Sequence, residues 1–290
     1  MSNARQVKQR IKTAKNISKI TKAMEMVSAS KMRKAQERAL SARYYTLALS
    51  DSLATLAQRI KDETLHPLLR VNTQGRPLAI VIGTDKGLCG SLNQNLLKLV
   101  LTWLKENPKG EIVAVGKTII RMLKFWGIDL KAQFSNLPDA VTTADIVGLS
   151  RLVIDGYLDQ EIKSVDLFFT DFINTLSQKP KRFPLLPLAS KLDELTNLVV
   201  TGPKAQYLFE PSASAILDEL LPFYIENMIY QAFLESRASE HSARMVTMKN
   251  ASENAGELVD SLKLIYNKER QASITNELLD ITTASMVLAK

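Results

Sequence analysis

The clearest candidate for chemistry in this sequence is a glycine-rich turn, Gly83-Thr84-Asp85-Lys86-Gly87-Leu88-Cys89-Gly90, which follows an apolar run. Such turns at helix N-termini can bind phosphate because their backbone N–H groups point at the anion. A P-loop requires a Gly-Lys-Ser/Thr unit, but here Lys86 precedes Gly87 and no Ser or Thr follows the lysine. The pattern Gly-x-Gly-x-x-Gly is absent as well. We therefore expect a tight structural turn, capped by Ser91 or Asn93.

Residues that could catalyse a reaction or bind a metal are scarce elsewhere. Cys89 is the only cysteine, so no intrachain disulfide can form, and with no histidine near it in sequence we expect a buried small hydrophobe. The two histidines, His66 and His241, are too far apart in sequence to suggest a metal cluster. Asp145 and Asp155 lie among helical apolar residues, and we interpret both as ordinary surface acids. The sequence thus predicts no catalytic site, no metal site and no cofactor.

Composition suits a globular chain: 290 residues, 46% of them hydrophobic and 23% charged, which is enough for one or two domains. No run of about 18 apolar residues occurs, so we expect any association with a membrane to be indirect.

Glycine and proline are concentrated in the middle of the chain. The first proline is Pro67 and the first glycine is Gly75, and after Pro222 only Gly256 follows. Because these two residues most often break helices, we predict a long N-terminal helix over about residues 3–60 and a second over about 212–290. Pro222 leaves open whether the second helix is continuous, kinked or begins there.

Apolar residues recur at helical spacing in both segments. The series are Val7, Ile11, Ala14, Ile20, Met24 and Val27; Leu49, Leu53, Leu56 and Ile60; Leu221, Ile225, Met228 and Ala232; and Leu258, Leu262 and Ile265. Small residues between them, Ala29 to Ala42 and Ala238 to Ala243, would allow close backbone approach. An antiparallel helix pair is the economical arrangement, and packing of both helices on the central domain is the alternative.

The charges of the two segments are complementary. Residues 1–45 hold twelve Lys or Arg and two acids, net +10, whereas residues 212–290 hold seven Lys or Arg and eleven acids, net −4. A basic helix can also bind nucleic acid or an anionic membrane. No aromatic residue lies among the cations before Tyr44, so stacking on bases has no platform, and we favour a basic stripe that faces solvent or another protein.

The central region alternates between strand and helix patterns. Apolar runs at 78–82, 112–115 and 165–172 indicate strands, and 92–104, 119–126 and 146–158 indicate helices. We predict a central Rossmann-like α/β domain with a mainly parallel sheet over 66–207, flanked by helices at 1–65 and 208–290 that form a long antiparallel coiled coil. The stretch 178–195 receives no assignment.

Three segments together carry a resemblance to a known family. The stretch from Arg10 to Gln36, RIKTAKNISKITKAMEMVSASKMRKAQ, is similar to the N-terminal signature of F-type ATP synthase gamma subunits. The runs ESRASEHSARM from Glu235 and YNKERQASIT from Tyr266 resemble the C-terminal helix of that family, and GLCGSLN from Gly87 resembles its central domain.

The resemblance implies a non-catalytic rotor shaft that couples ion-driven rotation of a membrane ring to ATP synthesis or hydrolysis on the beta subunits. It implies contacts with alpha, beta and epsilon subunits and with the membrane c-ring, and a peripheral location on the cytoplasmic face of a bacterial membrane. The residues that match the family's contacts with beta are Lys22, Met24, Arg270, Gln271 and Thr275. A nucleotide-binding α/β enzyme and a basic coiled-coil adaptor for nucleic acid are the competing interpretations.

Overall fold

The computed structural model describes residues 2–57, 66–188 and 212–288. The chain forms two compact units: unit 1 combines Met1–Ser28 with Arg244–Lys290, and unit 2 is Ala29–Ala243. Helices α1 (Ser2–Ala57) and α6 (Ala213–Leu288) each contribute to both units. The predicted domain boundaries at residues 65 and 207, and the end of the predicted first helix, lie outside the described residues.

Pro222 lies inside α6, which the structure gives as one continuous helix. Proline removes the hydrogen bond to the carbonyl four residues earlier, a cost that packing can offset. Its neighbours Leu221 and Ile225 are completely buried in the core of unit 2. The second long helix therefore does not begin at Pro222.

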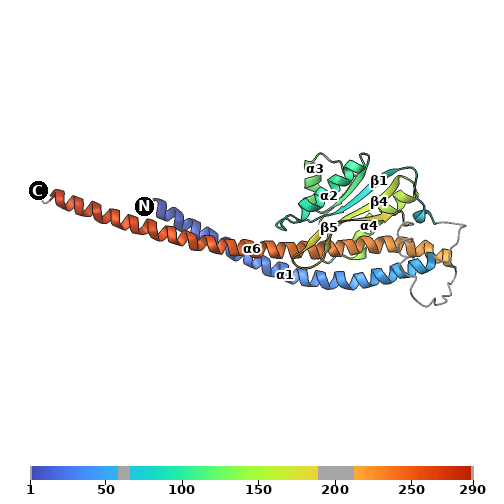
Figure 1. Ribbon diagram of the computed structural model, residues 1–290, viewed down its shortest axis with the longest axis horizontal. Helices are drawn as coiled ribbons and strands as arrows, with labels where there is room; N and C mark the ends of the chain where they lie inside the picture. Colours follow the sequence, from blue (N-terminus) through green and yellow to red (C-terminus); the bar gives the residue numbers. More distant parts are fainter. Residues whose placement is uncertain (1, 58–65, 189–211, 289–290) are drawn as a thin grey trace. The chain divides into compact units, whose positions relative to one another are not determined.

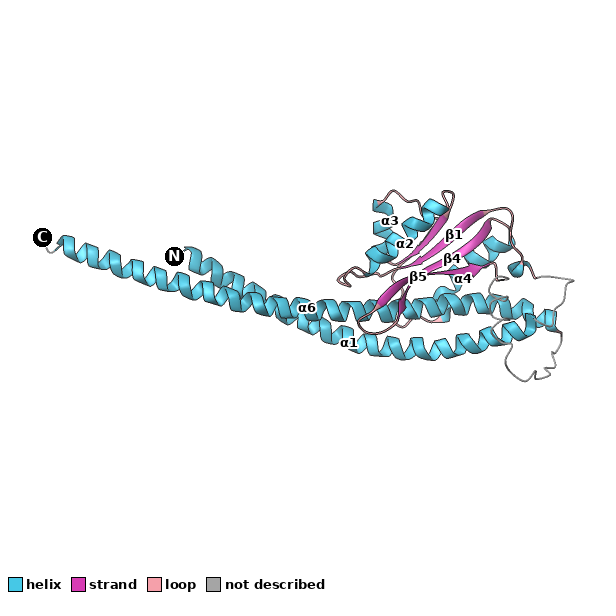
Figure 2. Cartoon of the chain, in the orientation of Figure 1, coloured by secondary structure: helices cyan, strands magenta, loops and turns pink. Residues whose placement is uncertain are grey.

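The sheet of unit 2 has five strands in the order β3-β2-β1-β4-β5 (Figure 2). They are β1 (Arg76–Ile82), β2 (Glu111–Val115), β3 (Ala132–Phe134), β4 (Ile162–Phe172) and β5 (Gln178–Leu186). The first four are parallel, as the alternating pattern predicted, and their order is that of a Rossmann-type sheet. The edge strand β5 pairs antiparallel with β4.

The unassigned stretch from residue 178 thus begins with β5. Pro180 and Pro184 lie inside this strand. Proline cannot donate to a sheet ladder and is tolerated at an edge, where one side of the strand has no partner strand. The prolines that concealed the strand in the sequence are consistent with its edge position.

Helices cover both faces of the sheet (Figure 1). On one face α2 (Leu92–Glu106) and α3 (Lys117–Phe125) enclose a core that includes Trp103 and Phe168. On the other face, α4 (Thr143–Leu158), the short 3-10 helix η1 (Pro67–Leu69) and the unit 2 segments of α1 and α6 form the larger core. Both faces are buried, which explains the nearly continuous apolar run of β1.

Within unit 2 the antiparallel helices α1 and α6 are joined by polar contacts. Asn227 Nδ2 donates to Thr46 Oγ1 at 2.9 Å, and Gln231 Nε2 donates to the carbonyl of Ala39 at 3.3 Å. Arg43 Nη2 lies 2.6 Å from Glu235 Oε1. In this unit the helices therefore pair with each other and also pack on the sheet, so both arrangements considered from the sequence occur.

Three serines of α6 bind β4 and the turn that follows it. Ser236 Oγ accepts a hydrogen bond from the backbone N–H of Thr170, and Ser239 Oγ donates to the carbonyl of the same residue at 3.0 Å. Ser242 Oγ donates to the carbonyl of Thr175. These serines therefore bring α6 close to β4 and the turn after it.

Two expectations about polar residues are corrected. Ser91 stands at the N-cap of α2 but makes no side-chain cap bond. Asn93 instead binds the preceding turn, because its Oδ1 accepts from Thr84 N and its Nδ2 donates to Thr84 Oγ1. Asp145 is more than a surface acid, since it forms a capping box with Thr142 at the start of α4.

Candidate partner-binding surface

Unit 1 is a two-helix antiparallel pair whose contact follows a seven-residue repeat. Buried and half-buried positions alternate at spacings of three and four on both helices, the pattern of a coiled-coil seam. On α1 they are Ala4, Val7, Ile11, Ala14, Ser18, Thr21, Glu25 and Ser28; on α6 they are Met248, Ser252, Ala255, Val259, Leu262, Tyr266, Glu269 and Ser273. Ser18 and Ser252 face each other across the seam, with 3.5 Å between their hydroxyl oxygens.

Small and polar residues occupy much of this seam, while larger apolar residues point outward. Ile20 and Val27 are 60% and 56% exposed, and Leu258 is 52% exposed, although the sequence placed all three on stripes that seek a helix partner. The seam follows the 3.5-residue period of a coiled coil, and these residues fall off it. The exposed large apolar residues of unit 1 are Ile17, Ile20, Met26, Val27, Leu258, Leu264, Ile265, Ile274, Leu278, Leu279 and Ile281.

The predicted contact residues lie on the same unit, at and beside the seam. Lys22 is exposed and forms an ion pair with Glu25 at 3.0 Å, and Met24 is half-buried beside the seam. Arg270, Gln271 and Thr275 are exposed. Thr275 Oγ1 donates to the carbonyl of Gln271 at 3.0 Å, within its own helix.

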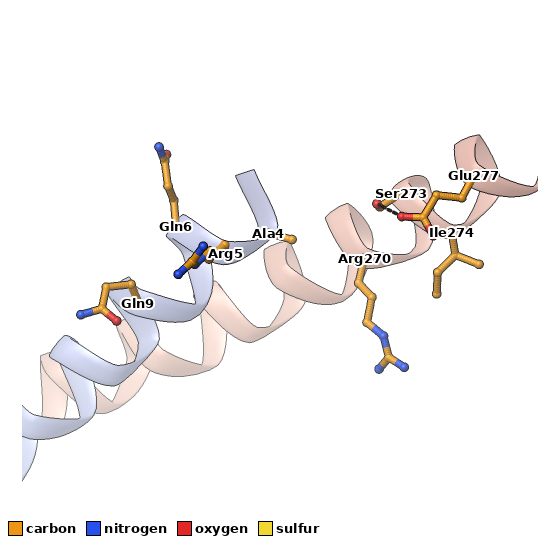
Figure 3. A pocket seen from close by; sticks show the side chains of 8 residues that line it. All are labelled: Ala4, Arg5, Gln6, Gln9, Arg270, Ser273, Ile274 and Glu277. Carbon is orange, nitrogen blue, oxygen red and sulfur yellow. Dashed lines mark hydrogen bonds between the residues drawn. The ribbon is translucent and has the colours of Figure 1, made fainter. Parts of the chain in front are cut away.

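Arg270 also lines a groove between the two helices (Figure 3). The other lining residues are Ala4, Arg5, Gln6 and Gln9 from α1, and Ser273, Ile274 and Glu277 from α6. Ser273 Oγ donates to Glu277 Oε1 at 3.1 Å. Two guanidinium groups from different helices thus line one groove, which suits an anionic or carbonyl-rich partner segment. Arg5 was not singled out from the sequence, because Arg270, which lines the same groove, is remote from it in sequence.

Asp85, in the glycine-rich turn, binds backbone N–H groups elsewhere in unit 2. Asp85 Oδ1 accepts hydrogen bonds from the backbone N–H of Lys117, at the N-terminus of α3, and from that of Asn136. The Asp85 carboxylate therefore lies at the N-terminus of α3, where the helix dipole favours an anion. Cys89 is 3% exposed and within 3.5 Å of Asn93 Nδ2, as expected for a buried small residue.

The histidines take structural positions. His66 Nδ1 accepts from the N–H of Leu68 at the start of η1, and burial lowers the pKa of His66. His241 is buried on α6. Within the described part of the chain, no group of three or more His, Cys, Asp or Glu side chains is arranged to hold a metal ion. Nor do the described helices include one that is long and apolar enough to cross a bilayer.

These features define a class of protein: a Rossmann-type α/β domain whose chain termini form an antiparallel coiled coil with an outward apolar and cationic surface. Comparison with known proteins gives the same class. A family model described as ATP synthase matches residues 3–288. The chain belongs to this family, among the ATP synthase gamma chains.

Two bacterial relatives establish the membership. The ATP synthase gamma chain of Acidovorax sp. (strain JS42) is 41% identical over 289 residues, covering 98% of this chain and 99% of the relative. That of Glaesserella parasuis serovar 5 (strain SH0165) is 41% identical over 292 residues, covering 99% of this chain and all of the relative (100%).

Solved structures agree in fold. A chain of the Euglena gracilis mitochondrial ATP synthase, in an OSCP/F1/c-ring structure, superposes with a TM-score of 0.70 at 21% identity, covering 99% of this chain and 95% of that one. A chain of the Tetrahymena thermophila mitochondrial ATP synthase, in a central stalk/c-ring structure, has a TM-score of 0.60 at 26% identity, covering 80% of this chain and 99% of that one.

Proposed function

We propose that this chain is the central rotor shaft of an F-type ATP synthase. It couples ion-driven rotation of the membrane ring to ATP synthesis, or hydrolysis, at catalytic sites on the beta subunits, and it has no catalytic site of its own. One observation carries the proposal: in unit 1, large apolar residues point away from the helix pair, whereas the seam holds many small and polar residues. Apolar surface on this scale marks a region that a partner encloses.

The coupling follows from asymmetry. A helix pair enclosed by three beta subunits makes different contacts with each, so the three nucleotide sites differ in affinity, and rotation exchanges those affinities. Because coupling between binding equilibria is reciprocal, nucleotide binding in the ring also biases the angle of the shaft. Supercoiled helices provide the stiffness that this requires.

The contacts with beta are made by Lys22, Met24, Arg270, Gln271 and Thr275. The exposure of Lys22 and of the three α6 residues supports this assignment, and so does the position of Arg270 in the groove of Figure 3. Arg5 lines the same groove and joins the set.

The other partners are the alpha subunits, the epsilon subunit and the c-ring, and nucleic acid is not among them. The residues 1–65 and 208–290 serve as the shaft, and 66–207 as the base that binds epsilon and the ring. The similar solved chains belong to rotor, F1/c-ring and central-stalk structures of ATP synthases, which supports this arrangement.

The chain is peripheral on the cytoplasmic face of a bacterial cell membrane and reaches the bilayer only through the complex. Two observations support this location. The relatives at 41% identity come from bacteria. The described helices lack a membrane span.

The test is a double substitution, Arg270→Ala with Gln271→Ala, in the complete complex in inverted membrane vesicles. We expect reduced ATP-driven ion pumping with an intact α/β domain, since both side chains point to solvent in the isolated chain. Lys263→Ala is the matched control, because Lys263 is exposed on the same helix and pairs only locally with Asp260. Unchanged pumping in the double variant would count against the contact assignment.

The composition of the complex is tested separately. Native mass spectrometry of the complex, extracted from its membrane, should find one copy of this chain with three copies of each of two larger subunits. A complex without such a ring would contradict the proposal.

A further inference from the structure

Arg237, on α6, binds one acceptor on its own helix and two acceptors elsewhere in unit 2. Its Nη1 donates to Glu240 Oε2 at 2.8 Å, and its Nη2 donates to the carbonyl of Leu137 at 3.1 Å and lies 3.5 Å from Asp85 Oδ2. The Arg237 and Glu240 side chains are only 9% and 4% exposed. A planar guanidinium bound at several points holds one orientation, so Arg237 fixes how α6 faces its neighbours.

Asp85 is itself firmly held. Besides Arg237, its carboxylate accepts from the N–H groups of Lys117 at 3.1 Å and Asn136 at 3.3 Å. The adjacent Thr84 is buried and is tied to α2 through Asn93 and to α3 through the N–H of Thr118. The ion pair therefore links α6 to the end of β1 and to the elements that follow β1, β2 and β3.

The loop that contains Leu137 also contacts α1. Asp139 binds Lys31 of α1 through its Oδ2, and its Oδ1 lies 4.0 Å from His241 Nε2 on α6. Both long helices thus make charged contacts with one loop of the α/β domain. We call the group Lys31, Asp85, Asp139, Arg237 and Glu240 the charged junction.

The charged junction lies near the boundary of unit 2 on both helices. Lys31 is three residues after Ser28, where unit 1 ends on α1, and Arg237 is seven residues before Arg244, where unit 1 resumes on α6. Both long helices therefore make charged contacts with the α/β domain within a few residues of where unit 1 begins.

We propose that Arg237 is a positioning residue for energy coupling: it locks the angle of α6 to the sheet so that torque passes between the helix pair and the α/β domain. The inference rests on the proposed rotor function. The remaining contact between α6 and the domain combines apolar packing, which is non-directional and resists rolling weakly, with hydrogen bonds from α6 to β4 and the turn after it. Charge-assisted hydrogen bonds are directional and resist it.

The experiment measures ions pumped per ATP hydrolysed by the complete ATP synthase in inverted vesicles. Arg237→Gln should retain hydrolysis and lower this ratio by about fivefold or more, the low end for coupling between sites. Asp85→Asn should give a similar loss, and the double variant should lose no more than either single one, because both substitutions break the Arg237–Asp85 pair.

The matched control is Arg182→Gln. Arg182 forms a two-point pair with Asp166 on β4, at 3.0 Å for both bonds, in the same unit and without either long helix. This variant should lower the melting temperature and leave the pumping ratio unchanged.

An unchanged ratio in Arg237→Gln overturns the inference, and so does an equal loss in Arg182→Gln, which would mark general destabilisation. If a complex that carries Arg237→Gln does not assemble, the isosteric Asp85→Asn tests the inference in its place. An unchanged ratio of ions pumped per ATP in that variant overturns the inference. Failure of the rotor function itself looks different: the unsubstituted chain would not be recovered with the ring.

Discussion

Arg43 on α1 and Glu235 on α6 form a tight ion pair, with Nη2 2.6 Å and Nε 3.2 Å from the same carboxylate oxygen. The Glu235 side chain is 4% exposed and also accepts from Gln231 Nε2 and from the N–H of Phe172 on β4. The hydrogen bond to Glu235 raises the pKa of Arg43. This one carboxylate connects both long helices and the sheet.

Arg43→Met should therefore destabilise unit 2, because it leaves a buried carboxylate without its cation. Arg43 itself is about half exposed, so we expect about 2 kcal/mol, below the range for a completely buried pair. Thermal or urea unfolding of the purified chain measures it. Lys22→Met, which breaks the exposed Lys22–Glu25 pair, should cost less than about 0.5 kcal/mol. Equal effects of the two substitutions would contradict the argument.

Gly116→Ala should strongly destabilise unit 2, because the added methyl group would clash with the backbone. Gly116 has φ of +103°, and a Cβ there would lie 2.8 Å from the carbonyl oxygen of Gly83, a backbone atom that cannot move aside cheaply. Gly127 is the control: its φ is +70°, and a Cβ would meet nothing within 4 Å. We expect about 1 kcal/mol for Gly127→Ala, the cost of the left-handed conformation, and clearly more for Gly116→Ala. Similar melting temperatures for both would be inconsistent with the crowding.

Substitutions of the outward apolar residues of unit 1 distinguish effects on folding from effects on assembly. Ile20→Gln with Val27→Gln should change the stability of the isolated chain by no more than about 0.5 kcal/mol, because both side chains are exposed there. The same variant should bind less tightly to a ring of alpha and beta subunits, as measured by native mass spectrometry of reconstituted mixtures. Ala14→Gln, on the seam, should do the reverse and lower helix stability first. Normal assembly of the double variant would show that these two side chains remain exposed to solvent in the complex.

Lowering the pH should destabilise unit 2 through protonation of Asp139. Its hydrogen bond with Lys31 lowers the pKa of Asp139 below the ordinary 3.8. The unfolded chain then binds more protons than the folded chain between the two pKa values, so this stabilisation is complete well above pH 3.8 and is lost as the pH falls through the folded value. Asp139→Asn should melt earlier than the unsubstituted chain at pH 7, and the two melting temperatures should converge once the pH falls below the folded-state pKa of Asp139. A difference that persists in acid would assign the effect to packing.

Much of the architecture was predictable from where glycine and proline are absent. The long helices, the parallel strands and the order of the elements all follow from local patterns, which a single sequence contains. Pro222 and β5 show the limit: proline signals a break, but a buried helix face or an edge position overrides that signal, and both depend on tertiary packing.

The surface was less predictable than the fold. The sequence placed Ile20, Val27 and Leu258 on stripes that would face a partner helix, since a 3.6-residue period and a 3.5-residue seam diverge only gradually. Arg5 and Asp85 were missed as parts of polar groups because their neighbours, Arg270 and Arg237, lie more than a hundred residues away. Only the fold brings such pairs together.

A rigid rotor shaft requires that the two ends of the chain turn as one body inside partner subunits. Ser18→Cys with Ser252→Cys tests it, since their hydroxyl oxygens are 3.5 Å apart across the seam and Cys89 is buried. Single-molecule rotation of the complex under ATP should continue at the same rate when this disulfide is closed. Rotation that stops on oxidation and resumes on reduction would show that the helices must move against each other, and would contradict the account.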